Sequence, residues 1–172
     1  PGLNTLVSPT PTYLYNLFAW GDNTYGATGN GSSGSNISSP VQIGSSSWTA
    51  VSAGGTHTTA IRSGGSLFAW GLNSSGQVGD NTVSPRSSPV QIGTDSWLDT
   101  AVGSSHTAAI RSDGKLFTWG GGAYGQLGYT TTPYSWTAVA SGLNHTVAIR
   151  SDGLLFAWGN GATGRLGTGN AI

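Results

Sequence analysis

The chain has 172 residues, and only 7% of its side chains are charged, with six basic against six acidic groups. This balance excludes long-range attraction to nucleic acid or to an anionic membrane, and the absence of cysteine excludes a disulfide framework and a thiol nucleophile. No apolar run approaches the roughly 20 residues that a membrane-spanning helix needs. The 29 glycines and the abundant Ser, Thr and Asn residues favour short strands joined by turns, so we predict an all-β protein.

Three series of residues repeat along the chain with the same spacing. They are Trp20, Trp70, Trp119 and Trp158, each in a Phe-(Ala/Thr)-Trp-Gly step; His57, His106 and His145; and Trp48, Trp97 and Trp136. The first series has separations of 50, 49 and 39 residues, and the other two have separations of 49 and 39. The chain is therefore a tandem repeat of about 49 residues with one shortened unit.

Each full unit contains four short segments with strand character. In the second unit these are "WTAVSAG", "HTTAIR", "SLFAWG" and "SPVQIG", and the second and third are separated by Gly64-Gly65. Asp113-Gly114 and Asp152-Gly153 take the place of this pair in the next units, and we expect type I′ hairpin turns at all three. Four antiparallel strands per unit predict the blades of a β-propeller.

The array is incomplete at several points. We predict an N-terminal extension at 1–16, a partial blade at 17–48, a blade at 49–97, a blade lacking its last strand at 98–136, and a partial blade at 137–172. After Gly128 the chain reads "YTTTPYSW" where earlier units contain "SSPVQIG". Either the gene lacks this strand or the recorded sequence omits a segment, and we favour the second because a lost strand exposes a sheet edge.

The repeated aromatic and histidine residues are predicted to form the structural core, because a strand inside a stack of blades is covered on both faces. They are Phe18, Trp20, Phe68, Trp70, Phe117, Trp119, Phe156 and Trp158, with His57, His106 and His145. A metal site at the histidines is not expected, since equivalent positions lie a blade apart and no Cys or Glu joins them. We expect each histidine to be hydrogen-bonded within or between blades.

These motifs resemble the regulator of chromosome condensation repeat family. The family pattern of a His-Thr-x-Ala-(Leu/Ile) strand, an Asp-Gly turn, a Trp-Gly step and a Gly-Gln-Leu-Gly loop is present at 106–128, and the likeness extends from Leu17 to Gly167. The resemblance implies a propeller, usually of seven blades, that serves as a binding platform. Some relatives are exchange factors for small GTPases, some are secreted enzyme inhibitors, and many occur in bacteria and their viruses.

About three and a half units cannot close a ring of seven blades. An open array would expose two aromatic blade faces, so we expect a protein partner: further copies of the chain, the rest of a longer chain, or other subunits of a large assembly.

Other motifs give little support for chemistry. The glycine loops lack the lysine and the helix of a phosphate-binding loop, so no cofactor is expected. Asp113 and Asp152 are used by turns, and Asp22, Asp80, Asp95 and Asp99 show no pairing that suggests catalytic carboxylates, so no catalytic residue is predicted. Arg62, Arg111 and Arg150 recur before the hairpin turns and are candidate partner-binding residues. The alternative is that they are solvated strand ends or bind carbonyls of a neighbouring blade.

Two functional hypotheses are consistent with these features. The first is a non-enzymatic structural or adhesive propeller in an assembly on a virion or a cell surface, which the neutral, polar composition favours by analogy. The second is a soluble protein-binding propeller, such as a small-GTPase exchange factor or an enzyme inhibitor, for which a cytoplasmic location is open. An enzyme is not expected, nor is binding to nucleic acid or insertion into a membrane.

Overall fold

The computed structural model describes residues 15–128 and 134–169. Within these ranges the regular structure is β-strand apart from one 3₁₀ turn, Ala162–Gly164, which agrees with the predicted all-β class. No helix in the described part is long and apolar enough to cross a membrane. Most of the extension predicted at 1–16 and of the shortened connection after Gly128 lies outside the described residues.

The strands follow the repeat. They are β1 (Phe18–Gly21), β2 (Ile37–Gln42), β3 (Trp48–Ala53), β4 (His57–Arg62), β5 (Ser66–Gly71), β6 (Arg86–Val102), β7 (His106–Arg111), β8 (Leu116–Gly120), β9 (Trp136–Ser141), β10 (His145–Arg150) and β11 (Leu155–Gly159). All pairs are antiparallel, in the orders β1-β2, β3-β4-β5-β6-β7-β8 and β9-β10-β11.

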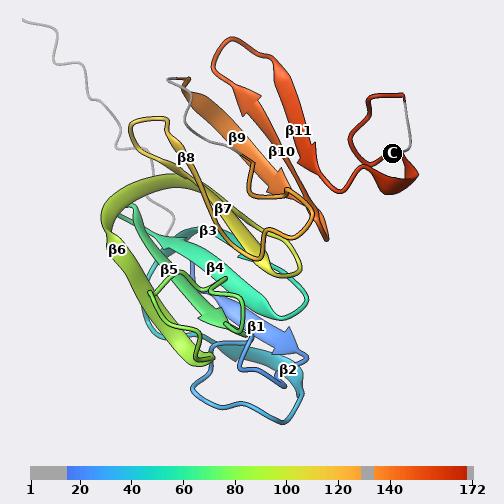
Figure 1. The fold of residues 1–172 in the computed structure, drawn as a ribbon. Coiled ribbons are helices and arrows are strands. Elements are labelled where there is room, and N and C mark those ends of the chain that lie inside the picture. Colours follow the sequence, from blue (N-terminus) through green and yellow to red (C-terminus); the bar gives the residue numbers. More distant parts are fainter. Residues whose placement is uncertain (1–14, 129–133, 170–172) are drawn as a thin grey trace, which may run out of the picture.

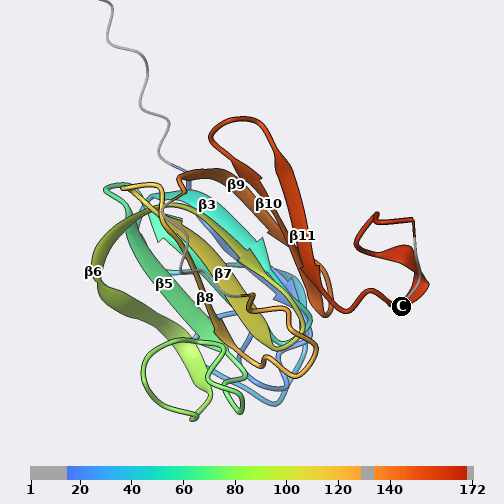
Figure 2. The ribbon, with the colours of Figure 1, turned by 45° about the horizontal axis from the view of Figure 1, so that its top comes forward.

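The long strand β6 connects two blades. Its first part pairs with β5, where Gln91 lies opposite Phe68, and its second part pairs with β7, where Ala101 lies opposite Ala108. We therefore define the first blade as β1 and β2, the second as β3 to β5 with residues 86–92 of β6, the third as residues 97–102 of β6 with β7 and β8, and the fourth as β9 to β11. Figures 1 and 2 show these sheets arranged in succession from the blue β1 to the red β11. The fold is a partial propeller, as predicted.

The hairpin turns form where predicted but with a different geometry. The Gly114 N–H donates to the Arg111 carbonyl at 2.8 Å, so the central turn residues are Ser112 and Asp113. Gly114 has a φ of +83°, whereas positive φ outside glycine is confined, in the described residues, to Asn81 and Thr163. This turn and the equivalent turn that ends at Gly153 are thus tight turns followed by a left-handed glycine, which suits a three-residue loop, so the predicted type I′ form is wrong at both. Gly64 and Gly65 both have positive φ as predicted, but the Gly65 N–H donates to the Arg62 carbonyl, so they are not the two central residues of that turn.

Neighbouring blades are joined at the glycine-containing loops. The Gln77 carbonyl accepts hydrogen bonds from the Trp119 indole Nε1 at 3.0 Å and from the Thr107 hydroxyl at 2.7 Å. Both donors belong to the third blade, and the loop comes after β5 of the second. The same joint is formed by Trp158 and Thr146 at the Gln126 carbonyl, and by Trp70 and Thr58 at the Ala27 carbonyl. Each joint satisfies an indole N–H and a buried hydroxyl at once.

The last glycine of each loop is required by this contact. Gly79 has a φ of +85°, and a Cβ placed there would lie 2.5 Å from Nε1 of Trp119. Gly29 and Gly128 would meet Trp70 and Trp158 in the same way, at 2.6 and 2.7 Å. These positions therefore need glycine both for the backbone conformation and for the close approach of the next blade's tryptophan.

Two histidines extend the joints. His57 Nε2 lies 3.0 Å from the Thr107 hydroxyl, and His106 Nε2 lies 2.9 Å from the Thr146 hydroxyl. Because each threonine donates its one hydroxyl proton to a loop carbonyl, the histidine donates from Nε2, a role that the neutral ring can fill. Burial, and secondarily a neighbouring histidine, lowers the pKa of His57 and of His106 to about 4, so both rings are neutral at pH 7. The expected hydrogen bonds between blades are confirmed for both.

The predicted aromatic core is buried only where neighbouring strands cover it. Trp70 is fully buried and Phe68 is 6% exposed, and Trp48 packs edge-on against Phe68 with ring centres 5.6 Å apart. Trp119, Trp158 and His145 are half-buried. Four residues depart from the prediction: Phe18, Trp20, Phe117 and Phe156 are 46%, 62%, 36% and 37% exposed. In the described residues no blade precedes Phe18 and Trp20, and no fourth strand covers Phe117 or Phe156.

Replacement of the buried tryptophan tests this packing. Trp70→Ala should lower the free energy of unfolding by about 3 to 5 kcal/mol, because it leaves a cavity and removes the indole donor from the Ala27 carbonyl. Trp20→Ala, in the same sequence step but exposed, should cost less than about 1 kcal/mol. Urea denaturation of both variants measures the difference, and equal losses would contradict the burial of Trp70.

The loop glycines allow a matched test of the joint. Gly79→Ala should cost the left-handed backbone penalty of about 1 to 2 kcal/mol plus about 1 to 3 kcal/mol for the clash with Trp119. Gly76→Ala, at φ +76° with no atom within 4 Å of the added Cβ, should cost only the first amount. Identical unfolding free energies for the two variants would show that Trp119 does not rest on Gly79.

Acid should weaken the joints through the histidines. The folded pKa values of about 4 lie below the unfolded value of 6.5, so the stabilisation is present above pH 6.5 and is lost as the pH falls toward 4. We expect a loss of roughly 3 kcal/mol per histidine over the whole interval. Urea midpoints measured between pH 7 and pH 5 should fall for the wild type. The double variant with His57→Gln and His106→Gln should show a flatter profile.

Candidate interaction surfaces

The loops after β1 and β5 form a rim of fixed shape around two buried asparagines. Asn73 Nδ2 donates to Asp80 at 3.0 Å and to the Thr82 carbonyl at 2.9 Å, while its Oδ1 accepts the Val78 N–H at 2.9 Å. Asn23 holds the loop after β1 in the same manner. Neither asparagine was predicted to have a role, although the repeated Trp-Gly-x-Asn spacing at 20–23 and 70–73 is a sequence signal for both.

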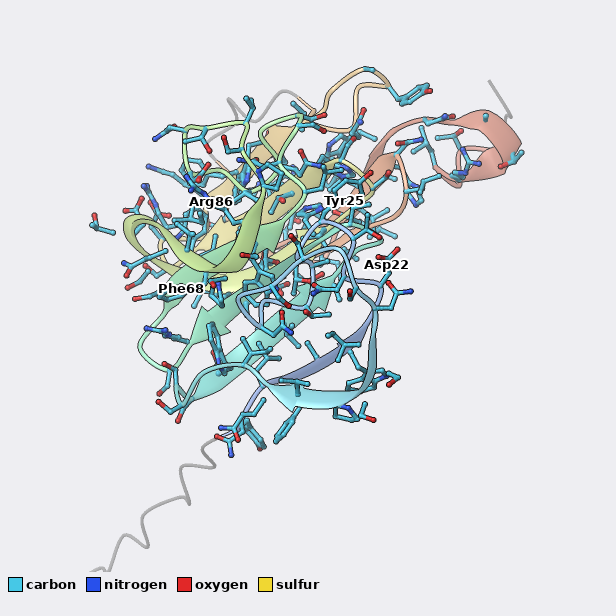
Figure 3. The ribbon with its side chains drawn as sticks, turned by 90° about the horizontal axis from the view of Figure 1, so that it is seen from below. Asp22, Tyr25, Phe68 and Arg86 are labelled. Atoms are coloured by element: carbon cyan, nitrogen blue, oxygen red, sulfur yellow. The ribbon has the colours of Figure 1, made fainter. Side chains whose placement is uncertain are left out.

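An ion pair fixes the second rim loop to the start of β6. Arg86 Nε lies 2.6 Å from Asp80, whose side chain is 6% exposed. Burial acts to raise the pKa of Asp80, but hydrogen bonds from Thr82 and Arg86 outweigh it, so that the pKa is lowered. The neighbouring loop also packs here, because the Gly31 N–H donates to the Ser87 carbonyl at 2.8 Å. Both rim loops are therefore tied to the start of β6, where Figure 3 labels Arg86.

The rim presents aromatic side chains to solvent. The rim also includes the equivalent loop after β8. Tyr25 in the loop after β1 and Tyr124 in the loop after β8 occupy equivalent positions and are 43% and 56% exposed. Asp22 lies on the same loop as Tyr25, where the Thr24 hydroxyl and N–H lower its pKa (Figure 3). Exposed tyrosines on a rigid frame can bind a protein at little entropic cost, since their side chains have few rotatable bonds.

The three recurring arginines are held inside their own blades. The Arg62 guanidinium lies 3.9 Å from the Phe68 ring centre, and those of Arg111 and Arg150 lie 4.9 Å from Phe117 and Phe156. Arg111 also pairs with Asp113, which raises the pKa of the guanidinium and lowers that of the carboxyl. Arg150 pairs with Asp152 in the same way. These contacts are not the contacts to neighbouring carbonyls that were one part of the alternative. The other part, solvated strand ends, and partner binding by the arginines both stay predictions.

Other acidic groups have structural contacts too. Asp99 accepts the Val139 N–H at 3.0 Å and so links the third blade to the fourth, and Asp95 lies 3.5 Å from Arg111. Asp113 and Asp152 accept N–H groups within their hairpins, as predicted. Across the described ranges no three His or Asp side chains are grouped to hold a metal ion.

The first and fourth blades each present an apolar face. At the beginning of the array, a cavity of about 430 Å³ is lined in part by Phe18 and Trp20 of β1 and by Val51 of β3. At the other end of the array, Leu155 of β11 is 69% exposed and Ile149 of β10 is 40% exposed. Apolar side chains on both end faces are typical of surfaces that other protein covers.

Comparison with known proteins identifies the repeat. A model described as "Regulator of chromosome condensation (RCC1) repeat" matches residues 16–61 and 64–110, and a second model of the same description matches 48–77, 98–126 and 136–165. The chain is 36% identical over 66 residues to human "Probable E3 ubiquitin-protein ligase HERC3", which is 37% of this chain and 6% of that protein.

Solved structures agree with this match. Human WBSCR16 superimposes with a TM-score of 0.80 at 25% identity, over 91% of this chain and 46% of that one. Prp20p from Saccharomyces cerevisiae gives a TM-score of 0.76 at 21% identity, over 92% of this chain and 45% of that one. The chain spans less than half of each of these proteins and a small part of the ligase. Since the first repeat model alone matches more than half of its residues, the chain belongs to the regulator of chromosome condensation (RCC1) repeat family.

Proposed function

We propose that this chain is a non-catalytic protein-interaction array, which packs its end faces against further blades of the same kind and binds a protein at its loop rim. The contrast between equivalent residues carries the proposal. Trp70 is buried where it contacts the loop of the first blade, and Phe68 is buried beside residues 86–92 of its own blade. Phe18 and Trp20, by contrast, are 46% and 62% exposed. The Phe-Ala-Trp-Gly step is therefore uncovered at the beginning of the described array.

The two ends carry complementary halves of the joint between blades. Gly167 ends the last loop, "GRLG", as Gly79 ends "GQVG". A Cβ at Gly79 would meet Trp119, but one at Gly167 would have no atom within 4 Å. At the opposite end Trp20 corresponds to the donor Trp70 and is exposed. A further blade at each end would supply the partners that the internal joints have.

The rim is the proposed surface for a separate partner protein. One solved relative, yeast RCC1 (Prp20), is described as bound to Kap60, and Prp20p is also described by its binding to Gsp1p and histones. These descriptions support a protein as the ligand, in line with the protein-binding hypothesis from the sequence. The charges cancel over the chain, so we expect the contact to depend on Tyr25 and Tyr124 more than on ion pairs.

The hypothesis of a virion or cell-surface assembly remains a proposal based on composition. An array with an unmatched half-joint at each end is suited to incorporation into a larger assembly, and few charges would oppose the contact of many subunits. Location on a virion or at a cell surface stays a prediction.

The native mass in solution tests the end faces. We expect the wild-type chain to associate, with a mass above the 17.4 kDa of one chain. The double variant with Phe18→Ser and Trp20→Ser should weaken association at least about tenfold, because it removes two exposed aromatic rings from the face. The control Val83→Ser removes an equally exposed apolar side chain from a rim loop and should not change the mass. Light scattering after size-exclusion chromatography gives these masses, and a wild type that is monomeric at all concentrations would contradict the proposal.

A further inference from the structure

The fourth strand of the second blade shows what a complete blade requires. Residues 86–92 of β6 lie along β5, with Gln91 opposite Phe68 and Val90 opposite Ala69. Ile92 is 8% exposed and belongs to a buried cluster with Leu67, Val78 and Trp97. This strand therefore covers the edge of β5 and also fills the apolar space between the second and third blades.

The third blade has no such strand in the described residues. Gly128 and Trp136 are connected by residues 129–135, whereas Gly79 and Trp97 are connected by 80–96, so the later connection is ten residues shorter. The side chains that the strand would cover are correspondingly open. Phe117 is 36% exposed, against 6% for its equivalent Phe68. Leu127 is half-buried, whereas its equivalent Val78 is fully buried.

A cavity of about 620 Å³ occupies this place. Its lining includes Leu116, Leu127, Tyr134, Trp136, Phe156 and Trp158. One end of the space is closed as in the complete blade, because the Trp136 N–H donates to the Gly114 carbonyl at 2.8 Å, as the Trp97 N–H donates to the Gly65 carbonyl at 2.9 Å. The groove thus has walls equivalent to those around the fourth strand of the second blade, but in the described residues no side chain takes the place of Ile92.

We propose that this groove accepts an extended segment of another protein, which pairs with the free edge of β8 as a fourth strand. The second blade defines the sequence that fits: Ser-Pro-Val-Gln-Ile-Gly, with Gln opposite Phe117, Val opposite Thr118 and Ile in the cavity. Strand addition to an open edge supplies main-chain hydrogen bonds, and an apolar pocket beside the edge supplies selectivity. This site is separate from the end faces, although the loop that carries Tyr124 contributes Gly122 and Gly125 to its lining.

The free edge of β11 does not offer the same site. Beside β8 the far wall is built by Trp136 and Trp158 of the fourth blade. In the described residues no blade comes after β11. A segment added to β11 would gain main-chain hydrogen bonds but no tryptophan-walled cavity for its isoleucine, so we expect binding at β8.

A synthetic peptide tests the proposal. Fluorescein-labelled Ser-Ser-Pro-Val-Gln-Ile-Gly, a copy of residues 87–93, should bind the whole chain saturably in fluorescence anisotropy. The same peptide with Ile→Asp should bind at least about tenfold more weakly, because a carboxylate would enter an apolar cavity. In the protein, Leu127→Lys should weaken binding of the unchanged peptide by a similar factor. Leu143→Lys, at a leucine that is 64% exposed and outside the groove, is the control and should leave binding unchanged.

Hydrogen exchange locates the peptide. Binding should slow amide exchange in residues 116–120 of β8 and leave the edges of β11 and β1 unchanged. Failure of the wild type to bind the peptide saturably would overturn the proposal, as would equal binding of the Ile→Asp peptide or protection at β11 in place of β8. The peptide variant keeps the test decisive if Leu127→Lys does not fold. The end-face variant with Phe18→Ser and Trp20→Ser should bind the peptide normally, which separates this result from that of the proposed function.

Discussion

The structure depends on one backbone carbonyl per unit, which lies in a glycine-bounded loop and accepts two hydrogen bonds from the next blade. In the second unit this is the carbonyl of Gln77, which binds the indole of Trp119 and the hydroxyl of Thr107. His57 then donates to the same threonine, so three side chains that would be costly to bury alone are satisfied together. Since the indole lies against Gly79, the hydrogen bonds and the packing share one geometry.

Most of the repeated residues have structural contacts in or near this joint. His57 and His106 are neutral donors within buried hydrogen-bond chains, and the arginines lie over aromatic rings of their own blades. The aspartates bind hairpin, loop or neighbouring-blade groups. We therefore propose recognition at the rim of fixed loops and at those surfaces where the repeat is interrupted.

The places where a strand or a blade is missing from the described array matter, because the side chains of each blade are buried in part by neighbouring strands and blades. Equivalent side chains differ in exposure according to the strands and blades beside them: Phe68 is covered by residues 86–92, and Phe117 has no such cover in the described residues. A complete blade of a repeat array therefore shows which side chains would fill the uncovered positions of an incomplete blade. The same logic applies to the end faces, where Trp20 is exposed and its equivalent Trp70 is buried.

The sequence by itself determined the repeat, the strands and the family, because the spacing of Trp, His and Gly is set by a unit that must bury the same groups each time. It also predicted that His57 and His106 are hydrogen-bonded within or between blades, and the structure decided that the bonds run between blades. Tertiary structure decided the turn type, the hydrogen bonds of the buried Asn23 and Asn73, and the ring contacts of the arginines. These features depend on which groups meet across strands and loops. The burial of individual aromatic residues was likewise undetermined, because identical Phe-Ala-Trp-Gly steps at 18–21 and 68–71 differ only in the blades beside them.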